Sequence, residues 1–321
     1  MAEHRSDVEA VDALALAYRN LKAEIGKIIV GQDEVVRAVI ISLFSNGHSL
    51  LVGVPGLAKT LLVSTIAEVL DLDFKRIQFT PDLMPTDITG SEILGEDRHF
   101  KFNRGPLFAN IVLADEINRT PPKTQAALLE AMQERSVTVS GVRHELPAPF
   151  FVLATQNPIE QEGTYPLPEA QLDRFMFNIP LTYPSYEEEI AVVKTTTGQE
   201  RKQLKNILSA IEIIQFQQLV RKIPIADNVL EYAVQLATRT RPGTPQATSE
   251  VNEYISWGAG PRASQYLVLG AKCHAAISGK YSPDKEDVQA IANYVLRHRI
   301  VRNYKAEAEG ISEEDIISHL M

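Results

Sequence analysis

The sequence has few of the features that mark exported, disulfide-stabilised or membrane-spanning proteins. Its 321 residues include a single cysteine, Cys273. One thiol cannot form an intrachain disulfide and has no partner for metal or redox chemistry, which fits a reducing cytoplasm. One of the longest apolar stretches, residues 35–44, is interrupted by Arg37 and Ser42 and falls short of the about 20 residues needed to cross a bilayer. These absences predict a cytoplasmic protein with no membrane insertion.

The charge pattern excludes further classes. A signal peptide needs a basic start and a continuous apolar core, whereas Asp7 and Glu9 lie near the start of this chain, so we do not expect export. The 41 acidic residues outnumber the 32 basic ones, and the net charge of −9 argues against a protein whose whole surface grips nucleic acid. With 45% hydrophobic and 23% charged residues, the composition is globular, which excludes disordered, collagen-like and coiled-coil chains.

The length and the hydrophobic pattern predict two domains. At roughly 150 residues per domain, one core is not expected to hold the whole chain. Up to about residue 183, short apolar runs alternate with helical patterns, which predicts an α/β domain with a parallel sheet. Beyond that point helical spacing dominates and predicts an all-helical domain over residues 184–321. In the first domain we expect strands at 49–52, 74–79, 111–114, 150–155 and 175–179 and helices at 8–27, 33–44, 59–70 and 121–134, the last with Thr120 as N-cap.

Two segments interrupt the alternation of strands and helices. Residues 80–107 are rich in Pro, Asp, Gly and charge and are too long for an ordinary connection, so we interpret them as a functional loop or a disordered insert. Residues 135–146 contain two short strand patterns around Ser140 and Gly141, which predicts a β-hairpin between a helix and the following strand.

The strongest motif lies between a predicted strand and a predicted helix, where a phosphate-binding loop must sit. Backbone N–H groups of such a loop converge on an anion, a lysine supplies charge to the β- and γ-phosphates, and a threonine hydroxyl coordinates Mg²⁺. The usual pattern has glycine at position 58, but the added methyl group is one that the start of a helix can tolerate. The alternative is a Gly/Pro turn followed by a solvated lysine. The octet consists of Gly53, Val54, Pro55, Gly56, Leu57, Ala58, Lys59 and Thr60.

Polar residues follow three other predicted strands or precede them. Asp115 and Glu116 end one strand, where the first would hold Mg²⁺ and the second would polarise the attacking water; the alternative is an acidic pair that caps a loop. Asn157 ends the next strand and could bind the γ-phosphate or the water, or could be a turn residue before proline. Arg174 precedes the last strand and could stabilise phosphate charge in a neighbouring subunit, or form an intramolecular ion pair.

Together these motifs resemble an AAA+ ATPase, and more closely the MoxR family of the helix-2-insert clade. The resemblance covers nearly the whole chain. It depends on residues 53–60 with their alanine, residues 115–119 (Asp-Glu-Ile-Asn-Arg), residues 122–132, residues 154–158 (Ala-Thr-Gln-Asn-Pro) and residues 172–175 (Leu-Asp-Arg-Phe). The fold that it implies is a P-loop AAA+ core over residues 1–183 with a parallel sheet, followed by a small helical lid domain over 184–321.

The resemblance also implies roles for individual residues. Gly53 to Thr60, with Leu61, form the Walker A motif; Asp115 and Glu116 form Walker B. Asn157 is implied as sensor 1 and Arg174 as the arginine finger, while Arg262 resembles sensor 2, acting in cis or in trans, or else is a solvated residue at a helix start. The residues implied for the adenine pocket are Val30, Gly31 and Gln32.

The activity implied is hydrolysis of ATP, with Mg²⁺, by a homo-oligomer that is usually a hexameric ring. Residues 80–107 would be the helix-2 insert and residues 135–146 the pre-sensor-1 hairpin, both facing the pore. Family members often work with partners that carry von Willebrand factor A domains, so the resemblance implies a separate protein client and a role as a chaperone-like remodelling ATPase.

Two other functions remain open. Related ring ATPases include helicases, and basic residues in the two inserts leave a nucleic-acid motor as an alternative; against it stand the net charge and the acidic residues of the same loops, Glu92, Glu96, Asp97 and Glu145. A nucleotide switch without turnover would not need Glu116. No Asn-Lys-x-Asp motif, no Gly-x-Ser-x-Gly motif and no paired Cys/His motif is present, so ATP is preferred over GTP, and triad and metalloenzyme chemistry are disfavoured.

Overall fold

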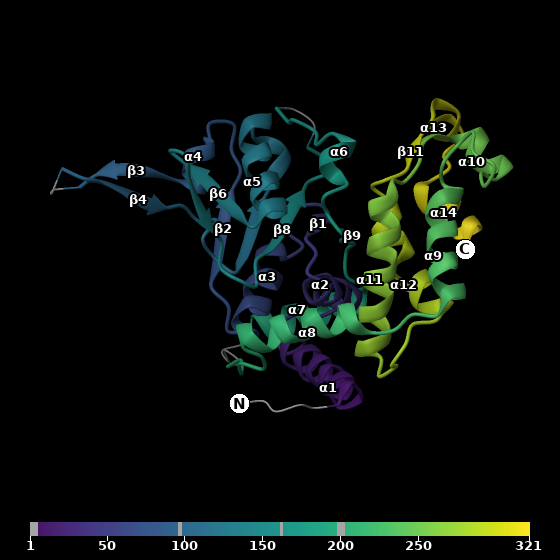
Figure 1. Cartoon of the computed structure of the whole chain (residues 1–321), viewed down its shortest axis with the longest axis horizontal. Helices are drawn as coiled ribbons and strands as arrows, with labels where there is room; N and C mark the ends of the chain where they lie inside the picture. Colours follow the sequence, from purple (N-terminus) through teal and green to yellow (C-terminus); the bar gives the residue numbers. More distant parts are fainter. Residues whose placement is uncertain (1–5, 96–97, 161–162, 198–202) are drawn as a thin grey trace.

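A five-stranded parallel sheet organises the first half of the chain (Figure 1). We describe a computed structural model over residues 6–95, 98–160, 163–197 and 203–321. The strand order is β2-β5-β8-β1-β9, so the chain crosses the sheet several times before it leaves. The strands are β1 (Ser49–Val52), β2 (Phe74–Gln78), β5 (Ile111–Asp115), β8 (Phe151–Gln156) and β9 (Phe177–Pro180). All five lie where the apolar runs predict strands.

The central strands are largely apolar because the sheet is covered on both faces. In β5 the side chains alternate between two hydrophobic cores: Ile111 and Leu113 contribute to one, and Val112 and Ala114 to the other. A strand buried on both faces is therefore read in the sequence as a continuous apolar run rather than as an alternation. The first core also includes side chains of α1 (Asp7–Ile25), α2 (Asp33–Phe44) and α3 (Lys59–Val69), and the second includes those of α5 (Pro122–Glu134).

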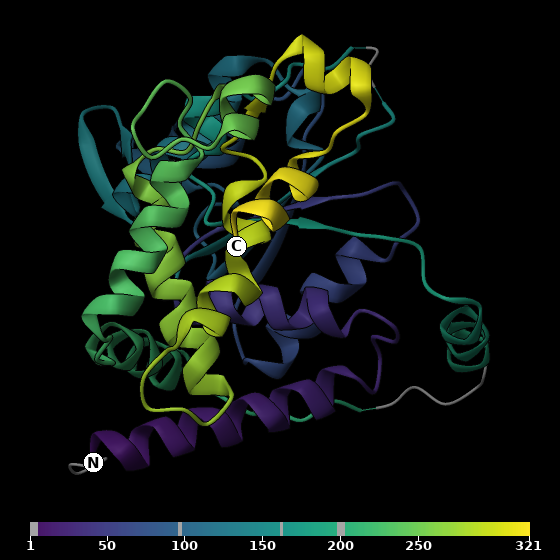
Figure 2. The same ribbon diagram turned by 90° about the vertical axis from the view of Figure 1, so that its right-hand side faces the viewer.

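Beyond β9 the described chain is mostly helical, and several of its helices contribute to the first core. Its helix α11 packs against α1, which runs beneath the lid in Figure 2. The helices of this part are α7 (Tyr186–Thr196), α8 (Ala210–Lys222), α9 (Asp227–Arg239), α10 (Ser249–Tyr254), α11 (Pro261–Ile277), α12 (Lys285–Leu296), α13 (Tyr304–Glu309) and α14 (Glu313–Leu320). A short antiparallel ribbon of β10 (Ile255–Trp257) and β11 (Val301–Arg302) adds strands that helical spacing does not predict, since each strand has only two or three residues.

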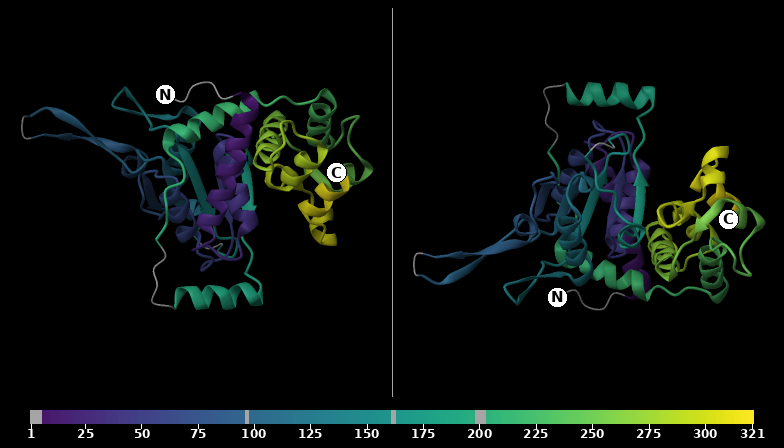
Figure 3. Two further views of the ribbon diagram at one scale, coloured as in Figure 1. Left: turned by 90° about the horizontal axis from the view of Figure 1, so that it is seen from below. Right: turned by 90° about the horizontal axis from the view of Figure 1, so that it is seen from above.

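Both inserts form projections on the same side of the sheet (Figure 3). Residues 80–107 fold into the short helix α4 (Pro85–Thr89) and a ribbon of β3 (Gly90–Leu94) and β4 (Phe100–Arg104), so the part of this insert that the structure describes is ordered structure rather than a plain loop. The predicted hairpin is confirmed as β6 (Ser136–Val139) and β7 (Val142–Glu145). Its turn residues Ser140 and Gly141 have φ values of 50° and 81°, the left-handed pair that a two-residue hairpin turn needs.

The expectation that Thr120 caps α5 is wrong. The N-cap residue is Pro121, with Pro122 in the first turn, and no side chain caps this helix start. The Thr120 hydroxyl instead donates to the Thr80 carbonyl at 2.7 Å, and the Thr124 hydroxyl donates to the Leu83 carbonyl at the same distance. These threonines are used to fasten the base of the first insert to α5, a contact between segments about 40 residues apart that no local pattern reveals.

Over the described residues, no helix combines the length and the apolar character that crossing a membrane requires.

Candidate functional site

The predicted phosphate-binding loop lies at the carboxyl end of β1 and leads directly into α3. Gly56 has a φ of 87° and Ala58 a φ of 54°, so both adopt the left-handed region. Glycine enters that region freely, whereas an L-residue such as alanine pays about 1 kcal/mol for it. Position 58 therefore has a backbone conformation that favours glycine, and the structure accommodates alanine there at a modest energetic cost.

Lys59 is held across the mouth of this loop. Its Nζ donates to the carbonyl oxygen of Gly53, at the other end of the loop. Burial lowers the pKa of Lys59 below its usual value, while the nearby carboxylates of Asp115 and Glu116 act in the opposite direction. The lysine and the two acidic residues that the sequence singled out are thus brought within electrostatic reach of one another.

The segment of Val30, Gly31 and Gln32 lies beside the loop. Gln32 Nε2 donates to the Leu57 carbonyl at 3.1 Å, while its buried Oε1 has no hydrogen-bond partner among the described residues. An unsatisfied buried oxygen of this kind is an acceptor open to a ligand donor. Gly31 has a φ of 74°, a left-handed conformation that favours glycine, and a side chain there would also crowd the Glu188 side chain on α7.

Asp115 ends β5 in a buried position and accepts hydrogen bonds on both oxygens. Thr155 Oγ1 donates to Oδ1 at 2.7 Å, and Arg76 contacts Oδ2 at 2.6 Å from Nη2 and 3.0 Å from Nε. Thr155 is fully buried in the neighbouring strand β8. Sequence reasoning assigned no role to Thr155 or Arg76; each is aligned with Asp115 only through the register of the parallel strands.

Glu116 follows in a left-handed conformation, with a φ of 58°. Its backbone N–H donates to Thr155 Oγ1 at 2.8 Å, and its Oε2 accepts from Gln78 Nε2 at 2.8 Å and from Arg119 Nη1 at 3.1 Å. Strained backbone at a non-glycine residue is often found at active sites, where neighbouring contacts hold it. The carboxylate is therefore fixed through one oxygen, and no hydrogen bond to Oε1 is found from the residues described.

Asn157 is buried at the end of β8 and belongs to the same network. Its Oδ1 accepts from the Ile159 backbone N–H at 3.2 Å, which is the turn role that the sequence left open, and its Nδ2 approaches Glu160 Oε2 at 3.4 Å. Glu160 lies 3.6 Å from Arg119, which also contacts Glu116. Arg119 thus connects Glu116 to Glu160, which in turn contacts Asn157. Sequence reasoning gave Arg119 no role, although its place in the 115–119 motif was an available signal.

Arg174 lies at the amino end of the parallel strands, whereas the loop lies at their carboxyl end. It precedes β9, which runs parallel to β1 with Phe177 beside Ser49 and Pro180 beside Val52. Since strands rise about 3.3 Å per residue, the paired stretch alone separates Arg174 from the loop by about 10 Å. Its Nη1 donates to the Leu129 carbonyl of α5 at 2.9 Å, so its intramolecular partner is a backbone carbonyl rather than a carboxylate.

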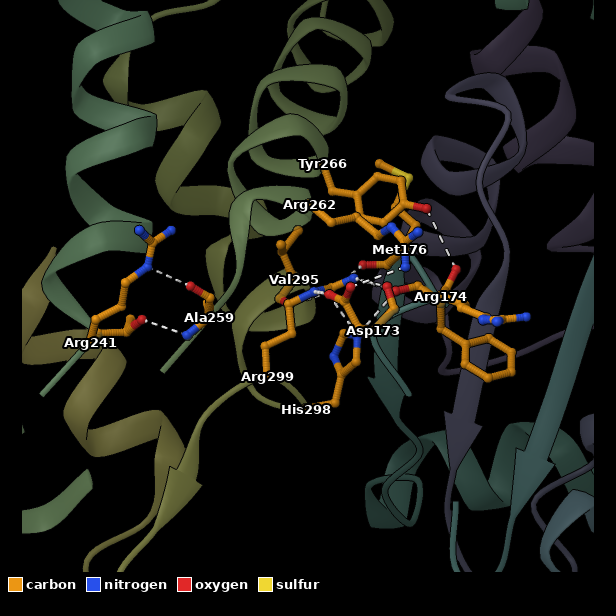
Figure 4. Close-up of polar contacts among 12 residues, drawn as sticks. Asp173, Arg174, Met176, Arg241, Ala259, Arg262, Tyr266, Val295, His298 and Arg299 are labelled. Atoms are coloured by element: carbon orange, nitrogen blue, oxygen red, sulfur yellow. Dashed lines mark hydrogen bonds and ion pairs between the residues drawn. The ribbon is translucent and has the colours of Figure 1, made fainter. Parts of the chain in front are cut away.

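Arg262 lies beside Asp173, the neighbour of Arg174 in the chain (Figure 4). It begins α11 and its Nη1 contacts Asp173 Oδ2 at 3.0 Å. The same carboxylate accepts from Arg299 Nε at 2.8 Å, and the Tyr266 hydroxyl lies 3.5 Å from the Arg174 carbonyl. The structure therefore groups Arg174 with the lid, and it groups Lys59, Asp115, Glu116 and Asn157 at the other edge.

Arg299 is the buried centre of this lid contact, and sequence reasoning missed it. Its side chain is 2% exposed, and burial lowers its pKa below the usual value for arginine. Besides Asp173 Oδ1, it donates from Nη2 to the carbonyls of Asp173 and Phe175, at 2.8 Å and 2.7 Å. A buried arginine needs this many acceptors because its five donors cannot be left without partners.

We predict that Arg299→Met lowers the free energy of unfolding by about 3 kcal/mol, because it removes the donors that satisfy buried carbonyls and Asp173. Urea titration followed by circular dichroism measures the change. Arg37→Met is the matched control, since Arg37 forms a partly exposed ion pair with Glu34 one turn away and should cost less than about 1 kcal/mol. Equal losses in the two variants would contradict the prediction.

Comparison with known proteins assigns the class of this fold and site. Residues 48–177 match the model of the ATPase family associated with various cellular activities (AAA), and residues 247–320 match the AAA lid domain. A crystal structure of a protein from Cytophaga hutchinsonii superposes with a TM-score of 0.91 at 42% identity, covering 97% of this chain and 95% of that one. The chain is an AAA family ATPase, with an α/β core and a helical lid.

The particular family follows from two curated relatives. The chain is 43% identical to Chaperone MoxR1 of Mycobacterium tuberculosis, over 99% of this chain and 85% of the relative. It is 30% identical to Protein MoxR of Methylorubrum extorquens, over 90% of each. The chain therefore belongs to the MoxR family of AAA ATPases.

Proposed function

We propose that this MoxR-type ATPase binds ATP with Mg²⁺ at the carboxyl edge of its sheet and uses hydrolysis to remodel a separate client protein. The observation that carries the proposal is the convergence of Lys59, Asp115 and Glu116 at the mouth of the loop, where the two carboxylates counteract the lowering of the lysine pKa by burial. A relative named as a chaperone supports the client role.

Residues 53–61 would receive the phosphates. Lys59 would exchange the Gly53 carbonyl for phosphate oxygens, and the backbone N–H groups at the start of α3 would face the same anion. The unsatisfied Oε1 of Gln32 would accept a hydrogen bond from the nucleotide. Thr60 and Asp115 fit Mg²⁺ because hydroxyl and carboxylate oxygens are its preferred ligands. When bound, Mg²⁺ would offset the negative charge of the phosphates.

Glu116 would act as general base for the attacking water. Its Oε2 is held by Gln78 and Arg119, which leaves Oε1 to take the proton. Asn157 would position the water or the γ-phosphate from the adjoining strand end. The hydrogen bond from its Nδ2 to Glu160 is long, at 3.4 Å, and therefore weak, so this donor could bind a ligand instead.

Arg174 and Arg262 would serve the site of a neighbouring subunit in a ring, as a hexamer would allow. Both lie at the sheet edge opposite their own phosphate loop, which supports action in trans for each. An arginine supplied across an interface stabilises phosphate charge in the transition state.

A protein client, such as one with a von Willebrand factor A domain, is favoured over nucleic acid. Several basic residues of the inserts contact other side chains of the same chain. Arg143 pairs with Glu145 at 2.9 Å, the Arg104 guanidinium lies 5.2 Å from the Phe108 ring centroid, and His144 stacks on Phe102. Glu96 and Asp97, two of the acidic residues in the sequence argument, lie outside the described residues.

The proposal predicts ATP turnover that requires Mg²⁺ and an assembled oligomer. Phosphate release should stop with EDTA, and turnover per chain should rise with protein concentration as rings form, with mass followed by sedimentation velocity. The chain has one tryptophan, Trp257, which is 70% exposed near the Arg262 edge, so its emission should change on assembly. Full turnover by a species of monomeric mass would contradict the ring.

A further inference from the structure

A groove of about 590 Å³ is lined by residues of both inserts. Its walls come from α4 and β3 of the first insert and from α5 and β6. Figure 3 shows the β3–β4 ribbon and the β6–β7 hairpin as two separate projections. Apolar side chains line part of it, among them the buried Ala131 and Val137 and the exposed Phe100. The groove is on the side of the inserts, and none of the predicted nucleotide residues lines it.

The hairpin presents one free strand edge to this groove. The Leu146 N–H donates to the Arg135 carbonyl at 3.0 Å, so residues 135 and 146 form a hydrogen-bonded pair of the antiparallel ladder. Bonded and unbonded pairs alternate along an antiparallel ladder, so Ser136 and Thr138 belong to unbonded pairs, and their backbone N–H and C=O groups point away from β7. Both residues line the groove.

The ribbon presents a second strand edge, part of which is free. The Gly95 N–H donates to the His99 carbonyl at 2.8 Å, which by the same alternation directs the backbone groups of Gly90 and Glu92 away from β4. Gly90 has no side chain, and it also lines the groove, so the contact there is with its backbone. The Gly90 N–H donates to the Thr86 carbonyl, and the Gly90 carbonyl accepts from Thr89 Oγ1 at 3.2 Å, which leaves Glu92 as the residue of this edge that can pair with a ligand. The edge of β6 and this part of β3 thus lie on one groove, an arrangement that can receive an additional strand.

The charge of the groove restricts what can enter it. Glu92 and Glu130 both line it with exposed side chains, and no lysine, arginine or histidine does so within the described part of the chain. Such a surface repels the phosphates of nucleic acid and attracts cationic side chains. The Phe102 ring of β4 stacks on His144 of β7 with centroids 4.0 Å apart, which holds the two inserts together at this site.

We propose that this groove binds an extended polypeptide segment as an added β-strand, with apolar side chains against Phe100 and Val137 and cationic side chains near Glu92 and Glu130. The proposal rests on the client role above and specifies the chemistry of the client segment. Backbone hydrogen bonds to a free edge would supply affinity without a fixed sequence, and the alternation of apolar and basic residues would supply preference.

A direct test uses a fluorescein-labelled heptapeptide of alternating lysine and valine, bound to the full-length chain and followed by fluorescence anisotropy. We expect saturable binding, and at least tenfold weaker binding of the same peptide with N-methylated backbone at alternate positions, because methylation removes the donors that a strand edge needs. Equal binding of both peptides would overturn strand addition.

Variants of the chain make the test specific to the groove. Thr138→Pro removes one edge N–H and should weaken peptide binding at least tenfold, whereas Thr138→Val keeps that N–H and should bind within twofold of the unmodified chain. Glu92→Lys combined with Glu130→Lys should weaken binding about tenfold, and Glu307→Lys, an exposed charge reversal on α13, should not. Unchanged binding in Thr138→Pro or in the double reversal would overturn the site.

The ATPase assay, run on the same samples, separates this proposal from the proposed function. Loss of peptide binding with normal turnover in the groove variants supports the groove as the client site. An unmodified chain that binds the peptide but hydrolyses no ATP would refute the proposed function and leave the groove intact. Displacement of the peptide by single-stranded DNA at low salt would overturn a polypeptide ligand.

Discussion

Glu116→Gln should abolish ATP hydrolysis and leave ATP binding intact. The amide cannot take a proton from water, and loss of a general base costs about 10²–10⁴ in rate. The substitution is close to isosteric, so the amide oxygen can still accept from Gln78 and Arg119 and the strained turn at residue 116 should persist. Phosphate release under single-turnover conditions measures the rate, and a fluorescent ATP analogue measures binding.

The control is Glu307→Gln, an exposed substitution of the same chemistry on α13, which should leave both quantities unchanged. Turnover in Glu116→Gln within a few-fold of the unmodified chain would exclude Glu116 as the base. The Glu116→Gln variant has a second use. A chain that binds ATP without hydrolysing it should retain its client, which can then be identified by mass spectrometry.

Arg174→Ala should reduce turnover by about 10³–10⁵ with ATP binding preserved, if this arginine completes the site of a neighbouring subunit. Its own loop is at the far edge of the sheet, so the lost charge is not one that its own subunit would use. Among the described residues, the substitution removes the hydrogen bond from Arg174 to the Leu129 carbonyl, a loss of about 1 kcal/mol that should leave the chain folded.

Mixing decides between action in cis and in trans. When Arg174→Ala and Glu116→Gln chains are combined in equal amounts, about a quarter of the interfaces in a randomly mixed ring pair an intact Glu116 with an intact Arg174. Turnover should therefore recover partly, although each variant alone is inactive. Absence of recovery, with mixed assemblies verified by differential tagging, would place the arginine in cis or outside the site.

The sequence was sufficient for the features that depend on local pattern. The apolar run of residues 111–114 predicts a strand buried on both faces, and the loop of residues 53–60 between a strand and a helix predicts where phosphate would bind. The acidic pair Asp115 and Glu116 at a strand end is also a local signal. In each case the chemistry and the element that positions it are adjacent in the chain, so spacing alone contains the information.

Local pattern failed where a residue has a distant partner. Thr120 is a residue type that often caps a helix, yet its hydroxyl donates to the Thr80 carbonyl at the base of the first insert. Thr155 looks like one more residue of a β-strand, yet it joins the Asp115 carboxylate to the backbone of Glu116. The environment of such side chains is set by strand register and helix packing, which one sequence does not display.

By itself, the sequence determined the class of the sheet, the order of its strands along the chain and the residues available for ATP chemistry. The tertiary structure decided which of those residues lie together: Lys59, Asp115 and Glu116 at one end of the sheet, and Arg174 and Arg262 at the other, beside the buried Arg299 that the sequence did not indicate. It also decided that the two inserts line one groove that holds Glu92 and Glu130. The physical reason is that hydrophobic periodicity and turn chemistry act over a few residues, whereas burial of a charge and the facing of two edges arise only when segments far apart in the chain pack together.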